Sequence, residues 1–486
     1  MRKLVIGLGL GLLLLASVVL LRTARIASRQ ATVAPAPEIQ VNTEQAAQNL
    51  SQSLRFQTIS YENPAQFKKD EFLAFHEFLA KAFPKVHATL AKEVAAEYSL
   101  LYTWKGQQQD LKQVLLMGHL DVVPVEPGTE QSWTYPAFEG RIAEGHVWGR
   151  GAWDDKSSVV ATLQAVELLL NQGFQPQRTL YLAFGHDEEI GGLKGATAIA
   201  ALLHSRGVAP EYVLDEGGII AEGMIPGISA PVSLIGIAEK GYLSLELTVE
   251  SPGGHSSMPP PQSAIGILSA AIHRLEQSPL PARFAGATRQ MYSYLGPEMP
   301  FLTRMIFANL WLFGGLLESR LAANPTTNAQ IRTTTAATIF EAGVKENVLP
   351  RKARAVVNFR ILPGESVQIV IANVKETVND PRVHIQVWGE LFSEPSRVSS
   401  TESPGFKTLE RTIRQVFPRV VVAPYLVVGA TDSRYYAELG ADTYRFLPFI
   451  IRSEDLPRLH GVNERVSVEG FAQAVRFYVQ LLRNSL

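Results

Sequence analysis

The fold class is decided by the stretch from residue 179 to residue 192, which reads Thr-Leu-Tyr-Leu-Ala-Phe-Gly-His-Asp-Glu-Glu-Ile-Gly-Gly. Its apolar part, Thr179–Phe184, has the length and composition of a buried strand. Three consecutive acidic residues follow, Asp187, Glu188 and Glu189, and then two glycines. Adjacent carboxylates repel one another unless a cation lies close by. The stretch therefore predicts a buried strand that ends at a cation site, with a solvated acidic loop as the alternative.

Two other apolar runs end in a similar way. Val114–Met117 leads into His119 and Asp121, and Tyr212–Leu214 leads into Asp215, a second acidic residue and two glycines. Positions i and i+2 of a strand share a face, so His119 and Asp121 can serve as a ligand and a carboxylate that holds its ring. Taken alone, this pair is better explained as a strand-end histidine with a capping aspartate.

A pair of acidic residues, Asp154 and Asp155, stands just before a helical pattern at Val159–Leu170. Acidic residues in this position can cap a helix, because the helix dipole stabilises negative charge at its N-terminus. The functional alternative is that Asp154 bridges two metal ions.

Strand-like runs alternate with helical stretches, which predicts an α/β fold with a mostly parallel sheet. The ends of parallel strands meet at one edge of the sheet, where such folds place their ligand sites. The chain has no cysteine, so any metal must be held by His, Asp or Glu. This donor set suits Zn²⁺ or a similar divalent ion.

The composition excludes several classes of protein. The 486 residues are 46% hydrophobic and 19% charged, enough to bury large cores in several domains. The net charge of -1 argues against a nucleic-acid-binding protein, which normally carries a basic surplus. The lack of cysteine excludes disulfides, thiolate zinc sites, iron–sulfur clusters and cysteine nucleophiles.

A second pattern begins near residue 243. Alternating residues at 243–250 predict a half-exposed strand, and the elements expected after it are a helix at 261–277, strands at 331–340 and 352–361, a helix at 364–379 and a strand at 383–389. This β-α-β-β-α-β order predicts a ferredoxin-like α+β domain. We place it at 242–392, inserted between two parts of the α/β domain, 46–241 and 393–486.

The N-terminus predicts a membrane anchor over residues 1–29. The apolar run Leu4–Leu21 is long enough, at about 1.5 Å per residue, to cross a hydrocarbon core. A cleaved signal peptide is the alternative, but Arg22 and Arg25 occupy the zone where small residues at the cleavage site would stand. Residues 30–45 are rich in Ala, Pro, Gln and Thr and are interpreted as a linker.

Taken together, these motifs resemble the M20 family of di-zinc metallopeptidases, and the resemblance covers about residues 45–486. It implies one zinc ion on His119 and Asp215 and a second on Glu189 and His460, with Asp154 as the bridge. Co²⁺ or Mn²⁺ is the alternative to Zn²⁺. His460 would otherwise pass for an ordinary loop histidine; it stands in Leu-His-Gly-Val-Asn-Glu at 459–464, which resembles the family's late histidine motif.

The resemblance also implies roles for residues around the metals. Glu188 would be the general base, and Asp121 would orient the ring of His119. Asp155 would share a cis peptide bond with Asp154. Residues 429–434, Gly-Ala-Thr-Asp-Ser-Arg, resemble a family loop beside the cleft, and no role is assigned to them.

In the inserted domain, residues 251–257 resemble the family's lid motif. There His255 would stabilise the oxyanion, often at the site of a partner subunit, so this lid domain could also form a homodimer. From the residues alone, His255 is a turn histidine. Arg360 would grip the carboxylate of the substrate through a two-pronged contact, and Asn347 and Arg332 are further substrate-binding candidates.

Within the family, the motifs at 185–192 and 331–335 most resemble the branch of carboxypeptidase S and the N-fatty-acyl-amino-acid synthase/hydrolase. Its members are commonly secreted or membrane-anchored. We therefore expect a single-pass anchored enzyme whose catalytic domain is extracytoplasmic: periplasmic, lumenal or secreted.

The expected activity is zinc-dependent hydrolysis of the amide bond next to a C-terminal free amino acid, in an N-acyl amino acid or a short peptide. With fatty-acyl substrates the reaction could run in reverse. The alternatives are an aminoacylase or dipeptidase of the same family, and a non-catalytic binding protein that retains the fold. The apolar segment Met299–Leu317 is expected to be a buried or dimer-packing helix pair; a wall for a long acyl chain or a membrane-resting edge is the alternative.

Overall fold

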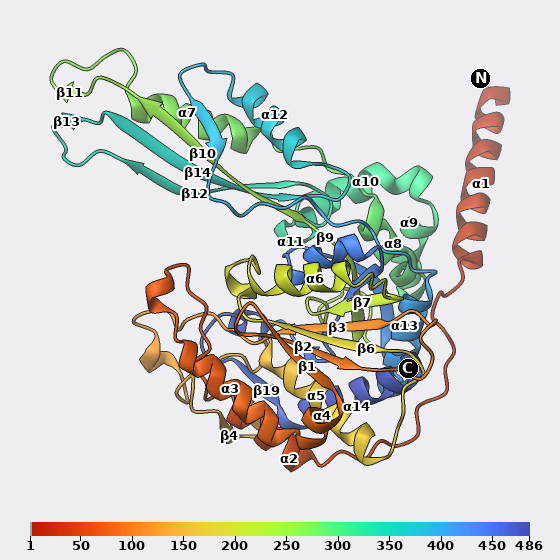
Figure 1. Cartoon of the computed structure of the whole chain (residues 1–486). Coiled ribbons are helices and arrows are strands. Elements are labelled where there is room, and N and C mark those ends of the chain that lie inside the picture. Colours follow the sequence, from red (N-terminus) through yellow and green to blue (C-terminus); the bar gives the residue numbers. More distant parts are fainter. Residues whose placement is uncertain (1) are drawn as a thin grey trace.

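The computed structural model of the chain describes residues 2–486 and shows a larger body, a smaller arm and a projecting N-terminal helix (Figure 1). The larger body contains a 10-stranded sheet in the order β1-β2-β6-β3-β7-β17-β9-β8-β18, with β16 paired to β9. Its strands are β1 (Ala91–Ala95), β2 (Ser99–Trp104), β3 (Val114–His119), β6 (Leu180–Gly185), β7 (Tyr212–Asp215), β8 (Ile220–Ala221), β9 (Val232–Glu239), β16 (Val421–Val427), β17 (Asp442–Arg445) and β18 (Ile450–Ile451).

The centre of this sheet is parallel, and its edges are mixed. β6, β3, β7 and β17 run parallel to one another, as do β9 with β16 and β8 with β18. β1 with β2, β2 with β6, β17 with β9 and β8 with β9 are antiparallel. The expectation of a mostly parallel sheet therefore holds at the centre, which carries the strand ends of interest, and the sheet as a whole is mixed.

Helices cover both faces of the sheet. Val114 and Leu116 of β3 pack in the same cluster as α5 (Lys156–Asn171), α13 (Pro404–Val416) and α14 (Val468–Ser485). Leu115 and Met117 face the other way, towards α6 (Gly195–Ser205) and η5 (Asp432–Leu439). Successive side chains of a strand point to opposite faces, so a strand covered on both sides must be apolar throughout. This burial explains the unbroken apolar runs of the sequence.

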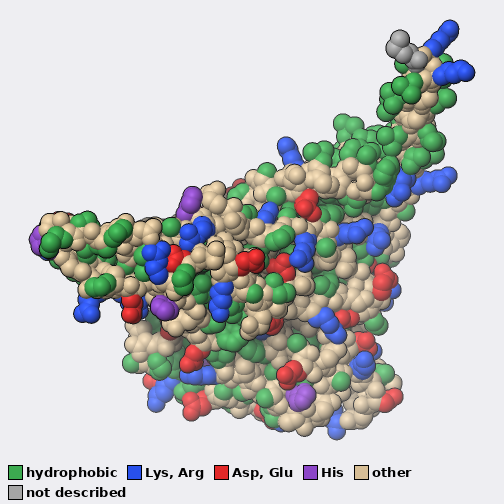
Figure 2. Space-filling view, turned by 90° about the horizontal axis from the view of Figure 1, so that it is seen from above, with side chains coloured by type: hydrophobic (Ala, Val, Ile, Leu, Met, Phe, Trp, Pro, Cys, Tyr) green, Lys and Arg blue, Asp and Glu red, His purple; other side chains and the backbone are tan. Residues whose placement is uncertain are grey.

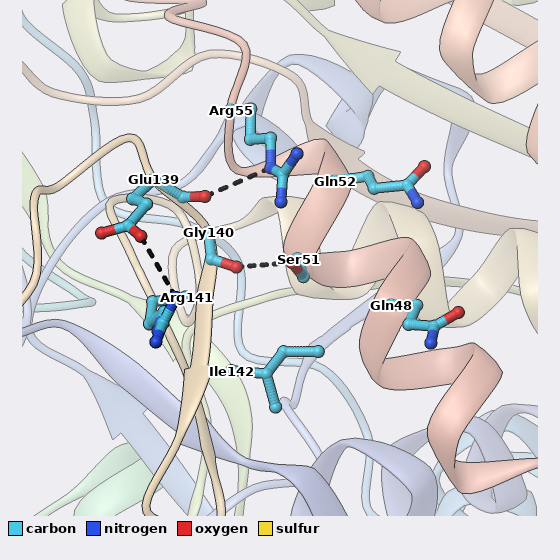
Figure 3. Close-up of a pocket in the computed structure, with 8 residues that line it drawn as sticks. All are labelled: Gln48, Ser51, Gln52, Arg55, Glu139, Gly140, Arg141 and Ile142. Carbon is cyan, nitrogen blue, oxygen red and sulfur yellow. Dashed lines mark hydrogen bonds and ion pairs between the residues drawn. The ribbon is translucent and has the colours of Figure 1, made fainter.

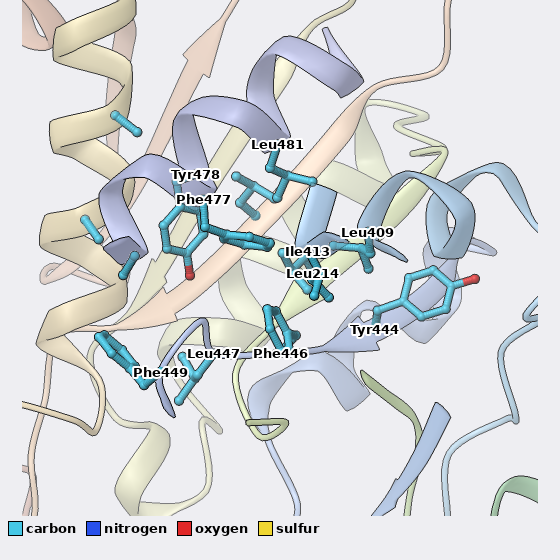
Figure 4. Packing of buried hydrophobic residues seen from close by; sticks show 14 of the residues in the cluster. Leu214, Leu409, Ile413, Tyr444, Phe446, Leu447, Phe449, Phe477, Tyr478 and Leu481 are labelled. Carbon is cyan, nitrogen blue, oxygen red and sulfur yellow. The ribbon is translucent and has the colours of Figure 1, made fainter. Parts of the chain in front are cut away.

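The larger of these two hydrophobic clusters packs the C-terminal helices against the sheet. Phe477 and Leu481 of α14 pack with Leu214 of β7, Ile413 of α13 and Phe446 (Figure 4). The remaining elements of the body are α2 (Thr43–Ser53), η1 (Pro64–Gln66), α3 (Lys69–Ala82), α4 (Pro84–Thr89), η2 (Glu130–Ser132), η3 (Glu188–Ile190), η6 (Leu456–Arg458) and a small sheet of β4 (Arg141–Ala143), β5 (His146–Trp148) and β19 (Arg465–Ser467).

The arm is a four-stranded antiparallel sheet in the order β12-β14-β10-β15, with two helices packed on it. Its elements follow the expected β-α-β-β-α-β order: β10 (Gly241–Glu250), α7 (Ala264–Gln277), β12 (Thr334–Ala342), β14 (Lys352–Ile361), α12 (Val367–Val378) and β15 (His384–Val387). The alternate residues Leu243, Leu245, Leu247 and Val249 of β10 form its core with α7 and α12. At the tip, β11 (Gly254–His255) pairs with β13 (Val348–Leu349).

One part of the range 242–392 does not pack with the arm. Helix α8 (Gly286–Leu295) lies against β16, and Ala287 and Met291 belong to the core of the larger body. After it come η4 (Gly296–Glu298), α9 (Phe301–Ala308), α10 (Leu310–Ala322) and α11 (Pro325–Ala329). None of the side chains of α9 is buried, and only Leu317 and Leu321 are buried in α10. The segment Met299–Leu317 is therefore not a buried helix pair within this chain, and its packing in a dimer stays a prediction.

The N-terminal helix α1 (Arg2–Arg25) projects from the body (Figure 1). It is long and apolar enough to cross a membrane by length and composition, and almost all of it is exposed. The predicted linker that follows lies along the body: Gln30 exchanges hydrogen bonds of 2.7 and 2.9 Å with the backbone of Val422. Asn42 then caps α2 through its side chain.

Candidate metal centre and active site

Three parallel strands bring the predicted residues to one edge of the sheet. β3 ends at His119, which lies opposite Gly185, the last residue of β6. β7 runs parallel to β3 on its other side and ends at Asp215. The acidic run after β6 and the acids after β7 therefore flank His119, as expected from the parallel order.

Two groups of potential metal ligands meet at Asp154. Its Oδ1 lies 2.9 Å from Nε2 of His119, and its Oδ2 lies 2.9 Å from Nε2 of His460. Glu216 completes the first group, with Oε1 at 3.6 Å from the same nitrogen of His119. Glu189 completes the second, with Oε2 at 3.3 Å from Nε2 of His460. Within each group the ligand atoms lie within 4.8 Å of one another.

The structure places Glu216, and not Asp215, in the first group. The carboxylate of Asp215 accepts a hydrogen bond of 2.9 Å from the backbone N–H of Ser433. Asp215 is the last residue of β7, and Glu216 is the first residue after it, so the two side chains leave the strand in different directions. Glu216 thus stands in the group where the sequence predicted Asp215, and which of the two binds a metal ion stays a prediction. The sequence contains the adjacent Glu216 but does not show the direction in which its side chain points.

Asp121 holds two parts of the site together. Nδ1 of His119 is hydrogen-bonded to the backbone carbonyl of Asp121 at 3.0 Å and lies 3.3 Å from its carboxylate, which accepts a hydrogen bond of 2.5 Å from Ser60. This carboxylate also accepts the backbone N–H groups of Glu188 and Glu189 at 3.2 and 3.1 Å. Asp121 therefore contacts both the ring of His119 and the acidic run after β6, and the orienting role expected of it stays a prediction.

A buried ion pair joins the two loops that carry Asp154 and His460. Glu464 lies 2.6 Å from Arg150 and accepts the backbone N–H of Asp154 at 3.2 Å. Arg150 in turn donates to the backbone carbonyls of His460 and Gly461 at 3.0 and 3.2 Å. Neither Arg150 nor Glu464 had a role in the sequence-based hypothesis, because partners so far apart in the chain leave no local pattern.

The backbone around Asp154 has the predicted unusual geometry. The peptide bond between Asp154 and Asp155 is cis. Asp155 is buried, and its carboxylate accepts the backbone N–H of His119 at 3.3 Å and bonds to Ser158 in the first turn of α5. Asp155 thus stands at the N-cap position of α5 without a side-chain bond to the helix backbone, and Asp154 is presented to the two histidines.

The two histidines are surrounded by acceptors. Hydrogen bonds with Asp154 and Glu189 raise the pKa of His460 to about 10. Burial alone would lower the pKa of His119, but its hydrogen bonds with Asp121 and Asp154 outweigh burial and raise that pKa well above its ordinary value. In the absence of a metal ion, the surrounding carboxylates therefore favour the protonated, positively charged form of both histidines.

The glutamates of the site favour their neutral, protonated form. Burial raises the pKa of Glu188, Glu189 and Glu216, and the negative charge of Asp154 adds to the effect in all three. Oε1 of Glu189 is buried without a hydrogen-bond partner. Clustered acids that retain protons and an orphaned carboxylate oxygen are what a divalent cation would satisfy. The donor set of imidazole nitrogen and carboxylate oxygen fits such an ion.

A basic group stands beside the acidic run. Arg434, in the loop at 429–434, donates a hydrogen bond of 2.7 Å to the carbonyl of Gly191. Burial lowers the pKa of Arg360, and the positive charge of Arg434 lowers it further. Arg360 stacks over Tyr242 at 4.7 Å from the ring centroid. Arg434 is a further candidate for binding substrate. The sequence motif at 429–434 contains it but gave no role for it.

The other predicted substrate residues lie elsewhere in this single chain. His255 is exposed at the tip of the arm, in β11, and Asn347 lies beside it, its carbonyl accepting the N–H of Ser256 at 3.2 Å. The side chain of Arg332 is bound to Asn328 at 2.9 Å and to the carbonyl of Leu280. The structure does not bring these three residues to the ligand groups.

A surface hollow of about 260 Å³ lies on another part of the body. Figure 3 shows it between α2 and the segment at 139–142. Its lining residues are Gln48, Ser51, Gln52, Arg55, Glu139, Gly140, Arg141 and Ile142. No candidate site residue is among them, so this hollow has no part in the chemistry of the ligand groups.

Comparison with known proteins shows the family of the chain. Residues 115–484 match the family model of peptidase family M20/M25/M40. The chain belongs to this family. This M20 chain is 45% identical to "Probable carboxypeptidase S-like 2" of Dictyostelium discoideum, over 90% of the chain and 85% of the relative. It is 43% identical to "N-fatty-acyl-amino acid synthase/hydrolase PM20D1" of Xenopus tropicalis, over 91% of the chain and 86% of the relative.

Solved structures support the fold of the M20 chain. The M20 family metallo-carboxypeptidase Sso-CP2 from Sulfolobus solfataricus superposes with a TM-score of 0.64 at 19% identity, covering 90% of this chain and 98% of the other. The expected membership of the family, and of its carboxypeptidase S and N-fatty-acyl-amino-acid hydrolase branch, is thus confirmed. The protein is an enzyme of the hydrolase class, and the binding-protein alternative falls away.

Proposed function

We propose that this M20 hydrolase uses two Zn²⁺ ions to cleave the amide bond that joins an acyl group to a free amino acid. The observation that carries the proposal is the pair of ligand groups that share Asp154, with Glu188 beside them. One ion would be held by His119, Asp154 and Glu216, and the other by Asp154, Glu189 and His460. Co²⁺ or Mn²⁺ would suit the same donors.

Bound ions of this kind lower the pKa of water and polarise the carbonyl of the scissile amide. Glu188 would accept the proton of the attacking water and deliver it to the leaving amine. Its backbone N–H is bonded to Asp121, and burial raises the pKa of its carboxyl above the ordinary value, which favours its holding a proton. Asp121 would keep the ring of His119 in its ligand orientation.

Arg360 would bind the carboxylate of the substrate, and we add Arg434 as its partner. Arg434 is hydrogen-bonded to Gly191 in the loop that carries Glu188, and Arg360 is stacked on Tyr242; guanidinium groups suit a carboxylate placed next to the scissile bond. Arg332 is set aside, since its side chain is already engaged. Asn347 and His255 would act only from a partner subunit or after a movement of the arm.

The substrate class follows from the relatives. Carboxypeptidase S-like proteins and N-fatty-acyl-amino acid hydrolases are both similar to this chain over most of its length. Both names imply a product with a free amino acid carboxylate. We therefore favour N-acyl amino acids and short peptides, with reversal to condensation for fatty-acyl substrates; an aminoacylase or a dipeptidase is the alternative.

The placement of the enzyme is also a proposal. Helix α1 would anchor the chain as a single span, and the catalytic body would face the extracytoplasmic side. The arm would serve as a lid and as the surface of a homodimer, since its tip carries the exposed His255.

A hydrolysis screen tests the proposed activity. The full chain, stripped of metal and then supplied with Zn²⁺, is incubated with a panel of N-acyl amino acids and dipeptides, and the products are identified by mass spectrometry. We expect release of the free amino acid from N-acyl amino acids, dependent on the added metal. Cleavage of dipeptides alone would favour the dipeptidase, and no release from either panel would refute the proposal.

The acyl preference requires a separate comparison. Hydrolysis of N-acetyl and N-oleoyl derivatives of one amino acid is followed side by side, below the concentration at which the longer substrate aggregates. We expect the longer chain to be favoured in kcat/KM. Equal values would leave the amide hydrolase but remove the fatty-acyl specificity.

A further inference from the structure

Helices α9 and α10 expose an unusual group of large apolar side chains. Phe301 and Leu302 of α9 and Trp311, Leu312 and Leu316 of α10 are between 43% and 72% exposed. We call these five residues the apolar platform. Single exposed apolar residues are ordinary, but a contiguous group of this size marks a surface that contacts a partner or a lipid.

The apolar platform is joined to the N-terminal helix at the turn between α9 and α10. The buried side chain of Asn309 donates to the carbonyl of Val19 and lies 3.2 Å from the hydroxyl of Thr23. Arg22 donates to the carbonyl of Ala308 at 3.3 Å. Figure 2 shows hydrophobic side chains continuing from α1 onto the body at the root of the helix. The platform and the helix therefore form one connected apolar surface.

These contacts fix the depth of the platform relative to the apolar run of α1. Val19 lies within that run, and Leu21 is its last residue. Asn309 contacts Val19, two residues before Leu21, and Thr23, two residues after it, so the turn stands level with the end of the run. If α1 enters a bilayer, the turn is therefore carried to the boundary between hydrocarbon and headgroups.

The shape of the helix pair suits that boundary. α9 and α10 are apolar enough together to pass for a membrane span, but they bend by 110° at the break between them. Neither is long enough to span alone, since 8 and 13 residues rise by about 12 and 20 Å. Short apolar helices of this kind lie in the plane of the interface, with their exposed face towards the acyl chains.

Basic and aromatic side chains line a pocket of about 520 Å³ beside the platform. Arg22 and Arg289 supply two positive charges there against the one negative charge of Glu318. Phe284, Phe307 and Trp311 supply apolar walls. Tryptophan and arginine concentrate at membrane interfaces because each has an apolar part and a polar end. The lining therefore suits the headgroup region of an anionic bilayer better than a purely apolar partner.

We propose that the apolar platform is a second membrane contact, which rests in the same leaflet that the root of α1 enters. The bilayer is the occupant because α1 is continuous with the platform and sets its depth. The body would then be held against the membrane through two elements rather than tethered through a single flexible helix.

Site-specific fluorescence quenching tests this contact on the full chain. The protein has no cysteine, so each single-cysteine variant carries one environment-sensitive dye at a known place. The labelled positions are L302C and L316C on the platform, L10C on α1 as the reference for lipid contact, and V344C, which is 94% exposed on the arm, as the matched control. Each variant is reconstituted into vesicles of phosphatidylcholine and phosphatidylglycerol, with or without a lipid that bears a shallow nitroxide.

We expect the nitroxide lipid to quench the dye at residues 302 and 316, whereas the dye at residue 344 responds to iodide in the water and not to the lipid. Quenching by iodide at all three sites would overturn the proposal. Protection from both quenchers at 302 and 316 would also overturn it, because a second protein copy would then cover the platform. The readout does not depend on hydrolysis, so it stands apart from the proposed activity.

Discussion

At the scale of single residues, Glu188 is the group whose loss most directly tests the chemistry. Glu188→Gln keeps the size and the backbone hydrogen bond to Asp121 but removes the group that accepts the proton. We expect kcat to fall by about 10²–10⁴-fold, the usual contribution of a general base. Metal content, measured by mass spectrometry of the purified variant, should stay at the wild-type level.

The matched control is Glu77→Gln, an exposed residue of α3 with the same chemical change. It should retain both activity and metal. If Glu188→Gln kept wild-type turnover while its metal content was normal, another group would have to be the base.

Glu216 and Asp215 are adjacent, and variants of each show which of the two binds a metal ion. Glu216→Gln removes a charged oxygen from the group with His119 and Asp154, so the first metal ion should bind more weakly. Asp215→Asn keeps an acceptor for the N–H of Ser433 and should bind both ions. Titration of the metal-free variants with Zn²⁺ by calorimetry measures the difference. Loss of an ion in Asp215→Asn but not in Glu216→Gln would restore the assignment made from the sequence.

The ionisable groups of the site predict that the stabilisation of the protein by bound metal depends on pH. The pKa of His460 is raised to about 10, so its charged form stabilises the metal-free fold fully below 6.5 and this contribution is lost as pH rises through 10. The raised pKa values of Glu189 and Glu216 act in the same direction, because ionisation of these carboxyls opposes folding without a cation.

Metal competes with these protons, so the increase in Tm caused by Zn²⁺ should grow as pH rises from about 6.5 to about 9. The measurement is the difference in Tm between metal-loaded and chelated full-length protein at each pH. Taking the difference cancels buried groups away from the site, such as Lys240, whose pKa burial lowers to about 7. A constant difference in Tm across the range would contradict the proton competition.

At the scale of elements, we expect the ion pair of Arg150 and Glu464 to hold together the two loops that carry Asp154 and His460. Glu464→Ala leaves Arg150 buried without a counter-charge and frees the backbone N–H of Asp154. Breaking a buried pair in this way costs about 3–5 kcal/mol of stability. We expect that loss in chemical denaturation of the metal-free protein, together with weaker zinc binding, because Asp154 and His460 are no longer tied.

Glu454→Ala, an exposed residue a few positions earlier, supplies the control and should leave both quantities unchanged. A Glu464→Ala variant as stable as the control, with normal zinc affinity, would show that the loops hold their geometry without the pair.

The elements that could be predicted from the sequence are those with a local periodic signal. β3, β6 and β7 were found because burial on both faces makes them apolar throughout, and their parallel order placed His119 beside the acidic run. The β-α-β-β-α-β order of the arm was found through alternation in strands such as β10.

Features that depend on side-chain direction or on distant partners could not be predicted in this way. The choice between Asp215 and Glu216 turns on which side chain leaves β7 towards His119, a matter of one residue in an acidic pair. Arg150 and Glu464 meet across more than half the chain. The exposure of α9 and α10 was missed because an apolar run looks the same whether it faces a core or open surface.

At the scale of the whole molecule, the arm raises the question of how its tip takes part in catalysis. β11 and β13 lie at the far end of the arm, away from the sheet edge that carries the ligands (Figure 1). His255 is exposed there and does not reach the ligand groups of its own chain. Either the arm closes over its own body, or the tip completes the site of a second copy in a homodimer.

Mixing two inactive variants distinguishes these arrangements. In a mixed dimer of Glu188→Gln with His255→Ala, the His255→Ala chain keeps its own base and receives an intact His255 from its partner. Random pairing makes half of the dimers mixed, each with one complete site, so activity should recover to about a quarter of the wild-type value. The two variants are co-expressed with different affinity tags, and turnover of the pool is compared with that of each variant alone. No recovery would mean that His255 acts within its own chain, and full activity of His255→Ala alone would mean that the tip has no catalytic role.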